Sequence, residues 1–425
     1  MIPQAKLRQG IAGGLIAIVA IMPFHAFLSV WLGTLTGHEA IIEAWKEALL
    51  VLLALASAYL ALREPEVRDR LRSLPIVLVG LFVLAGLVVT AFTRPSLTAI
   101  AFGAKTDMEF LLAFVIAVLV ASPVLVKRLT GVILATSAVV IGFAVLQSTV
   151  LAPNFLSHFG YSKATIVPFQ TLDAGVSSLR FASTLGGPNQ LGTFLILPMA
   201  LAGVLAIRRR KYWWLVLDIA GAYALIHTYS RGAWLGALGA AIVVSIVSVS
   251  PRMRTKVAAG FGIVIVVASL VGAELVRKGS RLQYYIFHGE NLFSSGGGSD
   301  YQHIQSLRTG LTDSLTDPVG HGLGSAGPAI FHSGTGIIIE NNYLQISYET
   351  GWAGLAIFLA LIASLGLELG RRSGRHDLAA AALAALVGIS ITALTLPAWT
   401  DTSTALIFWI AAGAVIGLTP NTSHV

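Results

Sequence analysis

Two arginines stand beside long apolar stretches, and their side chains offer the clearest chemistry in the sequence. Arg231 lies in the run HTYSRGAWLG between two apolar segments, and Arg180 lies in SSLRFASTLGGPNQLG before a third. A guanidinium presents paired N–H donors that match the oxygens of a phosphate group. Ser230 and Gly232 flank Arg231, so the backbone there can approach a ligand closely. The alternative for Arg231 is that it only extends to the lipid headgroups. The alternative for the segment around Arg180 is an ordinary capped helix entry, which does not explain the arginine.

Three further polar residues are candidates for binding the same anionic substrate. Asn189 follows a Gly-Gly-Pro turn, where it can also simply cap the helix that begins there. Lys46 and Lys105 lie near the outer ends of two predicted helices, and each has acidic neighbours. For both lysines, local pairing is the favoured interpretation, with Glu47 beside the first and Asp107 and Glu109 near the second.

A second group of residues has the chemistry of a general base. Glu340 opens the run ENNYLQISYETG, and a carboxylate at a membrane interface can accept a proton from a hydroxyl group. His303 and His332 on the preceding long loop are the alternatives, with His288 and His321 as further histidines of that loop. A single loop histidine is more often just solvated, so the identity of the base stays open between the carboxylate and the imidazoles.

The start of the helix after Glu340 is crowded with polar side chains. Asn341 and Tyr343 follow at once and are candidates for contacting substrate, although an interfacial aromatic anchor explains a tyrosine equally well. Glu349 lies a turn or two deeper, where burying an acid is costly, so it is a functional candidate by position.

The composition shows which elements must position these residues. The chain has 425 residues, of which 56% are hydrophobic and 11% charged, and its mean hydropathy is +0.80. A soluble domain carries roughly 25% charged residues, and runs such as LPIVLVGLFVLAGLVVTAF are long enough, at about 20 residues, to cross a bilayer. The sequence predicts a single all-α polytopic membrane domain over residues 1–425. The chain has no cysteine, so disulfides and thiolate metal sites are excluded.

Hydropathy predicts twelve membrane helices separated by short connections. Their ranges are 10–34, 41–62, 74–92, 104–122, 129–149, 191–207, 212–229, 232–250, 256–275, 344–370, 378–399 and 404–418. Two connections are long, a first outer loop over 150–190 and a large outer loop over 276–343. Loops of this length usually carry function or disorder. The second contains DYQHIQSLRTGLTDSL, which predicts a short amphipathic helix at the interface.

The basic residues predict the orientation. Most of the 28 lysines and arginines lie in alternate connections such as REPEVRDRLR, RRRK and RRSGRH and near the N-terminus. The positive-inside rule then places both termini in the cytoplasm and the long loops outside. The net charge of +8 is therefore a topology signal, and no nucleic-acid partner is needed to explain it.

Four runs carry a resemblance to a known family: LRFASTLGGPNQLG, TYSRGAWLG, DPVGHGLGS and NNYLQISYETGWAGL, in this order. At these residues the sequence resembles the O-antigen ligase and polysaccharide polymerase family of bacterial envelope enzymes. The plan of twelve helices, with a large outer loop before the tenth, fits the same family, so the resemblance covers most of the chain.

The resemblance implies a multi-pass glycosyltransferase with a GT-C-like fold in the bacterial inner membrane, active on the periplasmic or outer face. Such an enzyme takes a glycan from an undecaprenyl pyrophosphate carrier and passes it to a hydroxyl of a glycan or glycolipid acceptor. Polymerases extend another carrier-linked repeat unit, whereas ligases use a lipid A core sugar. The pyrophosphate is a good leaving group, so the resemblance implies neither a metal nor a cofactor.

The resemblance also assigns residues, with departures. Arg180 and Arg231 match family arginines that would hold the pyrophosphate. In ligases a histidine commonly precedes the asparagine of the NNY motif, and here that position is Glu340. The loop helix before DPVGHG usually begins with an arginine; the nearest matches are His303 and, a turn later, Arg308. These departures favour a polymerase, with the ligase as the alternative.

A transporter of the same lipid carriers is a third hypothesis, from another class. Transporters tend to show inverted repeats and broken helices with polar residues near the middle of the membrane. In this sequence the polar candidates cluster at one face and no repeat is evident, which favours an enzyme.

Overall fold

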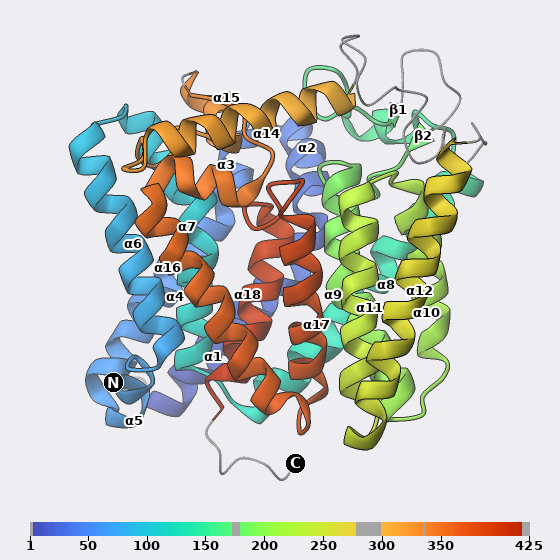
Figure 1. Cartoon of the computed structure of the whole chain (residues 1–425). Coiled ribbons are helices and arrows are strands. Elements are labelled where there is room, and N and C mark those ends of the chain that lie inside the picture. Colours follow the sequence, from blue (N-terminus) through green and yellow to red (C-terminus); the bar gives the residue numbers. More distant parts are fainter. Residues whose placement is uncertain (1–2, 172–178, 278–298, 335, 419–425) are drawn as a thin grey trace.

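The computed structural model describes residues 3–171, 179–277, 299–334 and 336–418, which form a bundle of long helices (Figure 1). Among these residues the only strands are β1 (Gln170–Thr171) and β2 (Leu179–Arg180), paired antiparallel with Gln170 opposite Arg180. The described part of the chain is therefore an all-α architecture with one minimal β-ribbon on its surface.

The helices of the first half are α1 (Gln4–Ile21), α2 (His25–Thr36), α3 (Glu39–Glu43), α4 (Trp45–Arg63), α5 (Pro65–Arg70), α6 (Leu74–Thr93), α7 (Leu97–Leu119) and α8 (Pro123–Thr149). Those of the second half are α9 (Pro188–Arg208), α10 (Trp214–His227), α11 (Arg231–Ser248), α12 (Pro251–Arg277), α14 (Ser299–Thr316), α15 (Ile330–Ser333), α16 (Asn342–Ser373), α17 (Asp377–Thr392) and α18 (Thr402–Ile416). Short 3₁₀ turns are η1 (Met22–Phe24), η2 (Phe155–Phe159) and η3 (Gly327–Ala329).

Each of the twelve apolar ranges contains a helix, and the membrane class is confirmed. Within the described residues, seven helical segments are long and apolar enough to cross a bilayer, while α17 and α18 are apolar but shorter. A chain with so many such segments is a multi-pass membrane protein. The number of crossings stays a prediction, as does the GT-C-like class.

Helix α17 ends earlier than its hydropathy indicates. The apolar run predicts a helix over 378–399, but the helix stops at Thr392. Pro397 follows closely, and proline disfavours helical geometry at the residue before it and removes a backbone donor. Residues 393–401 instead form a connection to α18, and its first residues face the candidate site described below.

Small residues let the central helices approach closely. Alanines fill α17 and are completely buried, and a Cβ on Gly236 of α11 would lie 2.5 Å from the carbonyl oxygen of Gly388. Close backbone approach at small residues is how membrane helices gain van der Waals contact without a hydrophobic driving force. The centre of the bundle, α17 and α18 in Figure 1, is therefore closely packed.

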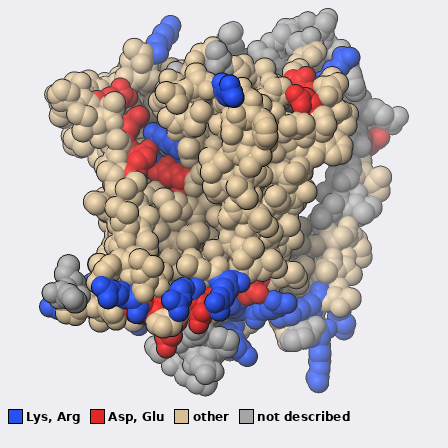
Figure 2. Space-filling view, turned by 90° about the vertical axis from the view of Figure 1, so that its left-hand side faces the viewer, with Lys and Arg blue, Asp and Glu red and all other residues tan. Residues whose placement is uncertain are grey.

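Basic residues form a belt at one edge of the bundle. Figure 2 shows lysines and arginines along the lower edge, where α1 begins and α18 ends in Figure 1. Several of them bind helix ends: Arg70 donates to the carbonyls of Val118, Leu119 and Ala121, and Arg372 donates to Ile416. Cations stabilise the carbonyl ends of helices. The assignment of this edge to the cytoplasm stays a prediction.

The opposite edge carries α14, α15 and the β-ribbon (Figure 1). Helix α14 lies across the upper end of the bundle and packs against α16, so the short helix predicted in the large loop is present. Residues 172–178 of the first predicted loop, and 278–298 with 335 of the second, lie outside the described residues, and His288 is among them.

Glu349, a functional candidate by position, anchors the large loop. Its Oε1 accepts hydrogen bonds from the backbone N–H groups of Gly324 and Ala326, both at 3.1 Å. Helix α16 is kinked two residues later at Gly351, which has φ +68°, and a Cβ there would lie 2.3 Å from the carbonyl oxygen of Val319. Only glycine fits this conformation and this contact. The motifs DPVGHGLGS and ETGWAG therefore fix the loop onto the bundle.

Candidate functional site

A cavity of about 410 Å³ opens at the upper edge of the bundle and collects most of the predicted site residues. Arg180, Asn189, Arg231, His303, Glu340 and Asn341 all line it. They come from β2, from the first turns of α9 and α11, from α14 and from the segment that leads into α16. The connection after α17 supplies a further part of the wall through Leu394, Thr395 and Leu396.

Arg180 is held in place by two hydrogen bonds. Its Nε donates to the carbonyl of Thr228 at 2.8 Å, and its Nη2 donates to Oδ1 of Asn189 at 2.9 Å. These bonds use two of the five guanidinium donors. Burial, followed by the charge of Arg231, lowers the pKa of Arg180 to about 10. The Arg180 side chain therefore stays protonated at neutral pH, and it lines the cavity together with the positively charged Arg231.

Asn189 orients Arg180 and does not cap α9. The N-cap residue of that helix is Gly187, and no side chain accepts a hydrogen bond from its first turn. The capping alternative is therefore wrong. Asn189 lies one residue inside the helix after Pro188, and its amide oxygen faces β2, where Arg180 is the partner.

Arg231 is the first residue of α11, immediately after a strained turn. Tyr229 has φ +50°, a left-handed conformation that is uncommon for a residue with a side chain. Ser183, three residues after Arg180, has φ +53° and is fixed by hydrogen bonds to Gln147 and Val140. Strain of this kind concentrates where the surrounding structure fixes functional groups. Both arginines therefore lie beside backbone held in a costly conformation.

Gly232 allows α11 to approach the connection after α17. A Cβ at this position would lie 2.2 Å from Oγ1 of Thr395. The glycine lines the cavity together with Thr395. The close approach that the structure shows is therefore between two parts of the chain, and the approach of a ligand to this backbone stays a prediction.

His303 and Glu340 line the same cavity as the arginines, and Nδ1 of His303 contacts Oε2 of Glu340, which makes an ion pair when the histidine is protonated. Each side chain is about one-third exposed, 35% and 33% respectively. Ser306 of α14 accepts a hydrogen bond from the backbone N–H of Glu340 at 2.9 Å. Helix α14 therefore fixes both members of the pair, and the two alternatives for the base are direct neighbours.

The two asparagines of the NNY motif hold the connection after α17. Asn341 caps α16, because its Oδ1 accepts from the N–H groups of Tyr343 and Leu344, and its Nδ2 donates to Leu394 at 2.9 Å. Asn342 accepts from the N–H of Trp399 at 2.7 Å. Asn341 thus lines the cavity with an amide whose oxygen and nitrogen both serve the fold.

Several predicted residues lie elsewhere. The Tyr343 hydroxyl donates to the carbonyl of Ser390 at 3.0 Å and does not line the cavity. Arg308 is exposed on α14, outside the cavity lining. His332 belongs to α15, and its side chain lies outside the described residues.

Lys46 and Lys105 share one acid and do not line the cavity. Their Nζ atoms lie 2.6 Å and 2.9 Å from Oε1 of Glu47. Local pairing was the favoured interpretation, and it describes both lysines, although Lys105 pairs with Glu47 and not with the acids nearest to it in sequence. The Lys46 side chain is 1% exposed and lies inside the bundle, whereas the Glu47 and Lys105 side chains are 28% and 30% exposed.

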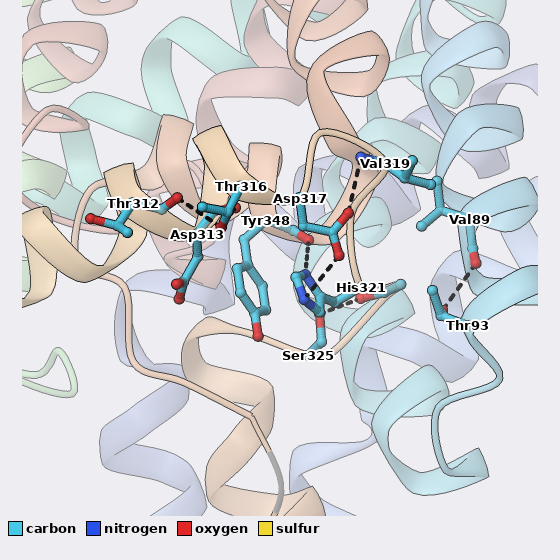
Figure 3. A network of polar contacts seen from close by, with 11 residues as sticks. Val89, Thr93, Thr312, Asp313, Thr316, Asp317, Val319, His321, Ser325 and Tyr348 are labelled. Atoms are coloured by element: carbon cyan, nitrogen blue, oxygen red, sulfur yellow. Dashed lines mark hydrogen bonds and ion pairs between the residues drawn. The ribbon is translucent and has the colours of Figure 1, made fainter.

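His321 belongs to a polar network that ties the loop to α16 (Figure 3). Its ring stacks on Tyr348 with centroids 3.9 Å apart, and its Nε2 lies 3.4 Å from Oδ2 of Asp317. Its backbone N–H donates to the carbonyl of Tyr348 at 2.8 Å. His321 does not line the cavity, so its contacts indicate a role in the fold.

Sequence reasoning missed the apolar part of the site. The cavity lining beside the charged groups includes Ile304 and Leu307 of α14, and Leu394 and Leu396 of the connection after α17. The one sequence signal for the latter segment is Pro397, which predicts a helix end. Within the described part of the chain, no group of three or more histidine, aspartate or glutamate side chains is placed to hold a metal ion. The chain matches no protein-family model and no curated protein.

Proposed function

We propose that this protein is a glycosyltransferase of the bacterial inner membrane that moves a glycan from an undecaprenyl pyrophosphate carrier to a sugar hydroxyl. The observation that carries the proposal is the cavity that Arg180 and Arg231 line together with the His303–Glu340 pair. Cations suit the pyrophosphate, and an acid–base pair suits the hydroxyl. A polymerase of repeat units is favoured, with the ligase to a lipid A core as the second candidate, because Glu340 stands where ligases commonly carry histidine.

The arginines would act on the leaving group. As the bond between the anomeric carbon and the pyrophosphate oxygen breaks, negative charge grows on that oxygen, and fixed guanidinium groups stabilise it without reorganisation. The like charges of Arg180 and Arg231 repel each other, and a bound pyrophosphate relieves this repulsion. The carrier pyrophosphate leaves with the electron pair.

The His303–Glu340 pair would act on the acceptor. The acceptor oxygen attacks the anomeric carbon from the opposite face, which inverts that centre, and its proton passes to the carboxylate of Glu340. The ion pair with His303 holds this carboxylate in place. Positioning two large substrates at fixed separation contributes to the rate through proximity.

The function is tested with purified protein in proteoliposomes that contain a short undecaprenyl pyrophosphate-linked oligosaccharide and no other acceptor. A ladder of longer glycans is expected on a gel. If glycan appears only when core lipid is added, the protein is the ligase. If neither product forms while the lipid-linked glycan crosses the bilayer, the transporter hypothesis replaces the enzyme.

Substitution of Asn189 tests the orientation of Arg180. Asn189→Ala removes one hydrogen bond to a charged group, worth about 1.5–3 kcal/mol, and is expected to raise the donor KM by about tenfold or more. Asn189→Asp should raise it further, because a carboxylate beside Arg180 competes with the pyrophosphate. Initial rates at varied donor concentration measure both effects. A donor KM that is the same in Asn189→Asp and wild type would show that Arg180 does not contact the donor.

A further inference from the structure

A second cavity adjoins the first and shares a wall with it. It measures about 200 Å³ and lies between the first turn of α9, η3 with α15, the segment before α16 and the connection after α17. Asn189, Glu340 and Leu396 line both cavities, whereas His303 and the two arginines line only the first. Glu340 is therefore the acid–base side chain that faces both spaces.

The second cavity has a different chemical character. No lysine or arginine lines it, so its lining offers no cation to a phosphate. Phe331 of α15, 75% exposed, presents an aromatic ring, and Pro328 and Ile338 add apolar surface. A few polar groups among apolar walls are typical of small-molecule sites.

Polar groups of the second cavity are available for hydroxyl groups. Within the described part of the chain, the Gln190 side-chain amide makes no hydrogen bond, and Asp401 uses Oδ2 to accept from the N–H of Thr404 at 3.2 Å. An amide and a carboxylate together donate to and accept from hydroxyls. An aromatic ring with nearby polar groups matches a sugar ring, which has an apolar C–H face and a hydroxyl rim.

We propose that the second cavity is the acceptor subsite, in which one sugar ring of the acceptor lies on Phe331 and hydrogen-bonds to Gln190. This inference rests on the proposed function, because it assigns the second substrate of the same reaction. The acceptor hydroxyl then lies where the two cavities meet, beside the Glu340 carboxylate, and reaches the anomeric carbon of the donor in the first cavity. The arrangement explains why Glu340 belongs to both cavities.

Binding without turnover gives the first test. The experiment is saturation-transfer difference NMR on the full-length protein in detergent, with methyl glycosides of glucose, galactose, N-acetylglucosamine and rhamnose as probes. At least one ring is expected to receive saturation. The signal should fall about fivefold in Gln190→Ala, as for the loss of one neutral hydrogen bond, fall in Phe331→Ala, and persist in Phe331→Tyr. It should also persist in Arg231→Ala, which alters only the first cavity. No signal from any probe, or an unchanged signal in Phe331→Ala, overturns the subsite.

Turnover gives the second test and separates the inference from the function. With the lipid-linked oligosaccharide as donor and the glycoside found by NMR as acceptor, Phe331→Ala and Gln190→Ala should raise the acceptor KM about fivefold and leave the donor KM unchanged. A raised donor KM would place the donor sugar in this cavity and overturn the assignment. If the wild-type protein transfers no glycan, the proposed function fails, and the NMR result still decides whether the cavity binds a sugar.

Discussion

Replacing Arg231 by alanine is expected to lower kcat for glycan transfer by about 10²–10³-fold, or about 2.7–4 kcal/mol of barrier, as for the loss of one donor from other oxyanion sites. The reason is that Arg231 begins α11 at the wall of the cavity and shares that cavity with the arginine whose pKa its charge lowers. An interaction that grows with charge on the leaving oxygen appears in kcat and not only in KM. The measurement is the initial rate at saturating donor in proteoliposomes.

Arg231→Lys and Lys163→Ala serve as the matched controls. Lysine keeps the charge but loses the planar pair of donors, so an intermediate rate is expected for Arg231→Lys. Lys163 is exposed in the first loop and does not line the cavity, so Lys163→Ala should be as active as wild type. A double variant with Arg180→Ala should show non-additive losses, because the two side chains act on one group. Full activity in a folded Arg231→Ala protein would remove the arginine pair from the mechanism.

The helices could be predicted from the sequence because the bilayer leaves few alternatives. A buried backbone in lipid must form its hydrogen bonds within the segment, so an apolar run of sufficient length becomes a helix, as in α6 and α8. The prediction failed where an apolar run served another purpose. Residues 393–399 are apolar enough to be predicted as the end of a helix. In the structure, however, Asn341 and Asn342 form hydrogen bonds with their backbone, and the segment connects α17 to α18. This pairing between distant segments is not visible in hydropathy.

The charged half of the site was also accessible from sequence. Arg180, Arg231 and Glu340 are expensive in apolar surroundings, and that cost makes them conspicuous. Their partners were less visible. Asn189 follows Pro188 and suggested a helix cap, but the tertiary structure gives its amide oxygen to Arg180. His303 and Glu340 are 37 residues apart, and only the packing of α14 on the start of α16 brings them together.

Residues of the right type were not necessarily residues of the site. Lys46 and Lys105 carry the charge that a pyrophosphate requires, but both pair with Glu47 and neither lines the cavity. Arg308 lies on the same helix as His303 and is exposed. The two residues are five positions apart. On an α-helix of 3.6 residues per turn this spacing is a rotation of about 500°, so their side chains lie on different faces. A sequence position near a motif therefore predicts proximity to a site only when the helical phase agrees.

The shared wall of the two cavities favours Glu340 over its partner as the base. His303 lines only the first cavity, which the two arginines also line, whereas Glu340 lines both cavities. A base must lie within hydrogen-bond reach of the hydroxyl from which it takes a proton. The histidine then acts as a positioning residue, which holds the carboxylate through the ion pair. The two roles predict different responses to substitution.

Glu340→Ala is expected to lower kcat by about 10²–10⁴-fold, the usual contribution of a general base, with the donor KM unchanged because the arginines remain. Formate at high concentration should restore activity by about tenfold, since a small carboxylate fits the gap and supplies the missing base. His303→Ala should lose less activity, and imidazole should not restore it, because a positioning group cannot be replaced by a freely diffusing one. The readout is the initial rate of glycan transfer in proteoliposomes for each variant with and without the added base.

The reverse pattern, with imidazole rescue of His303→Ala and no formate rescue of Glu340→Ala, would make His303 the base. The base would then still be a histidine, as in the ligases, and Glu340 would be its partner.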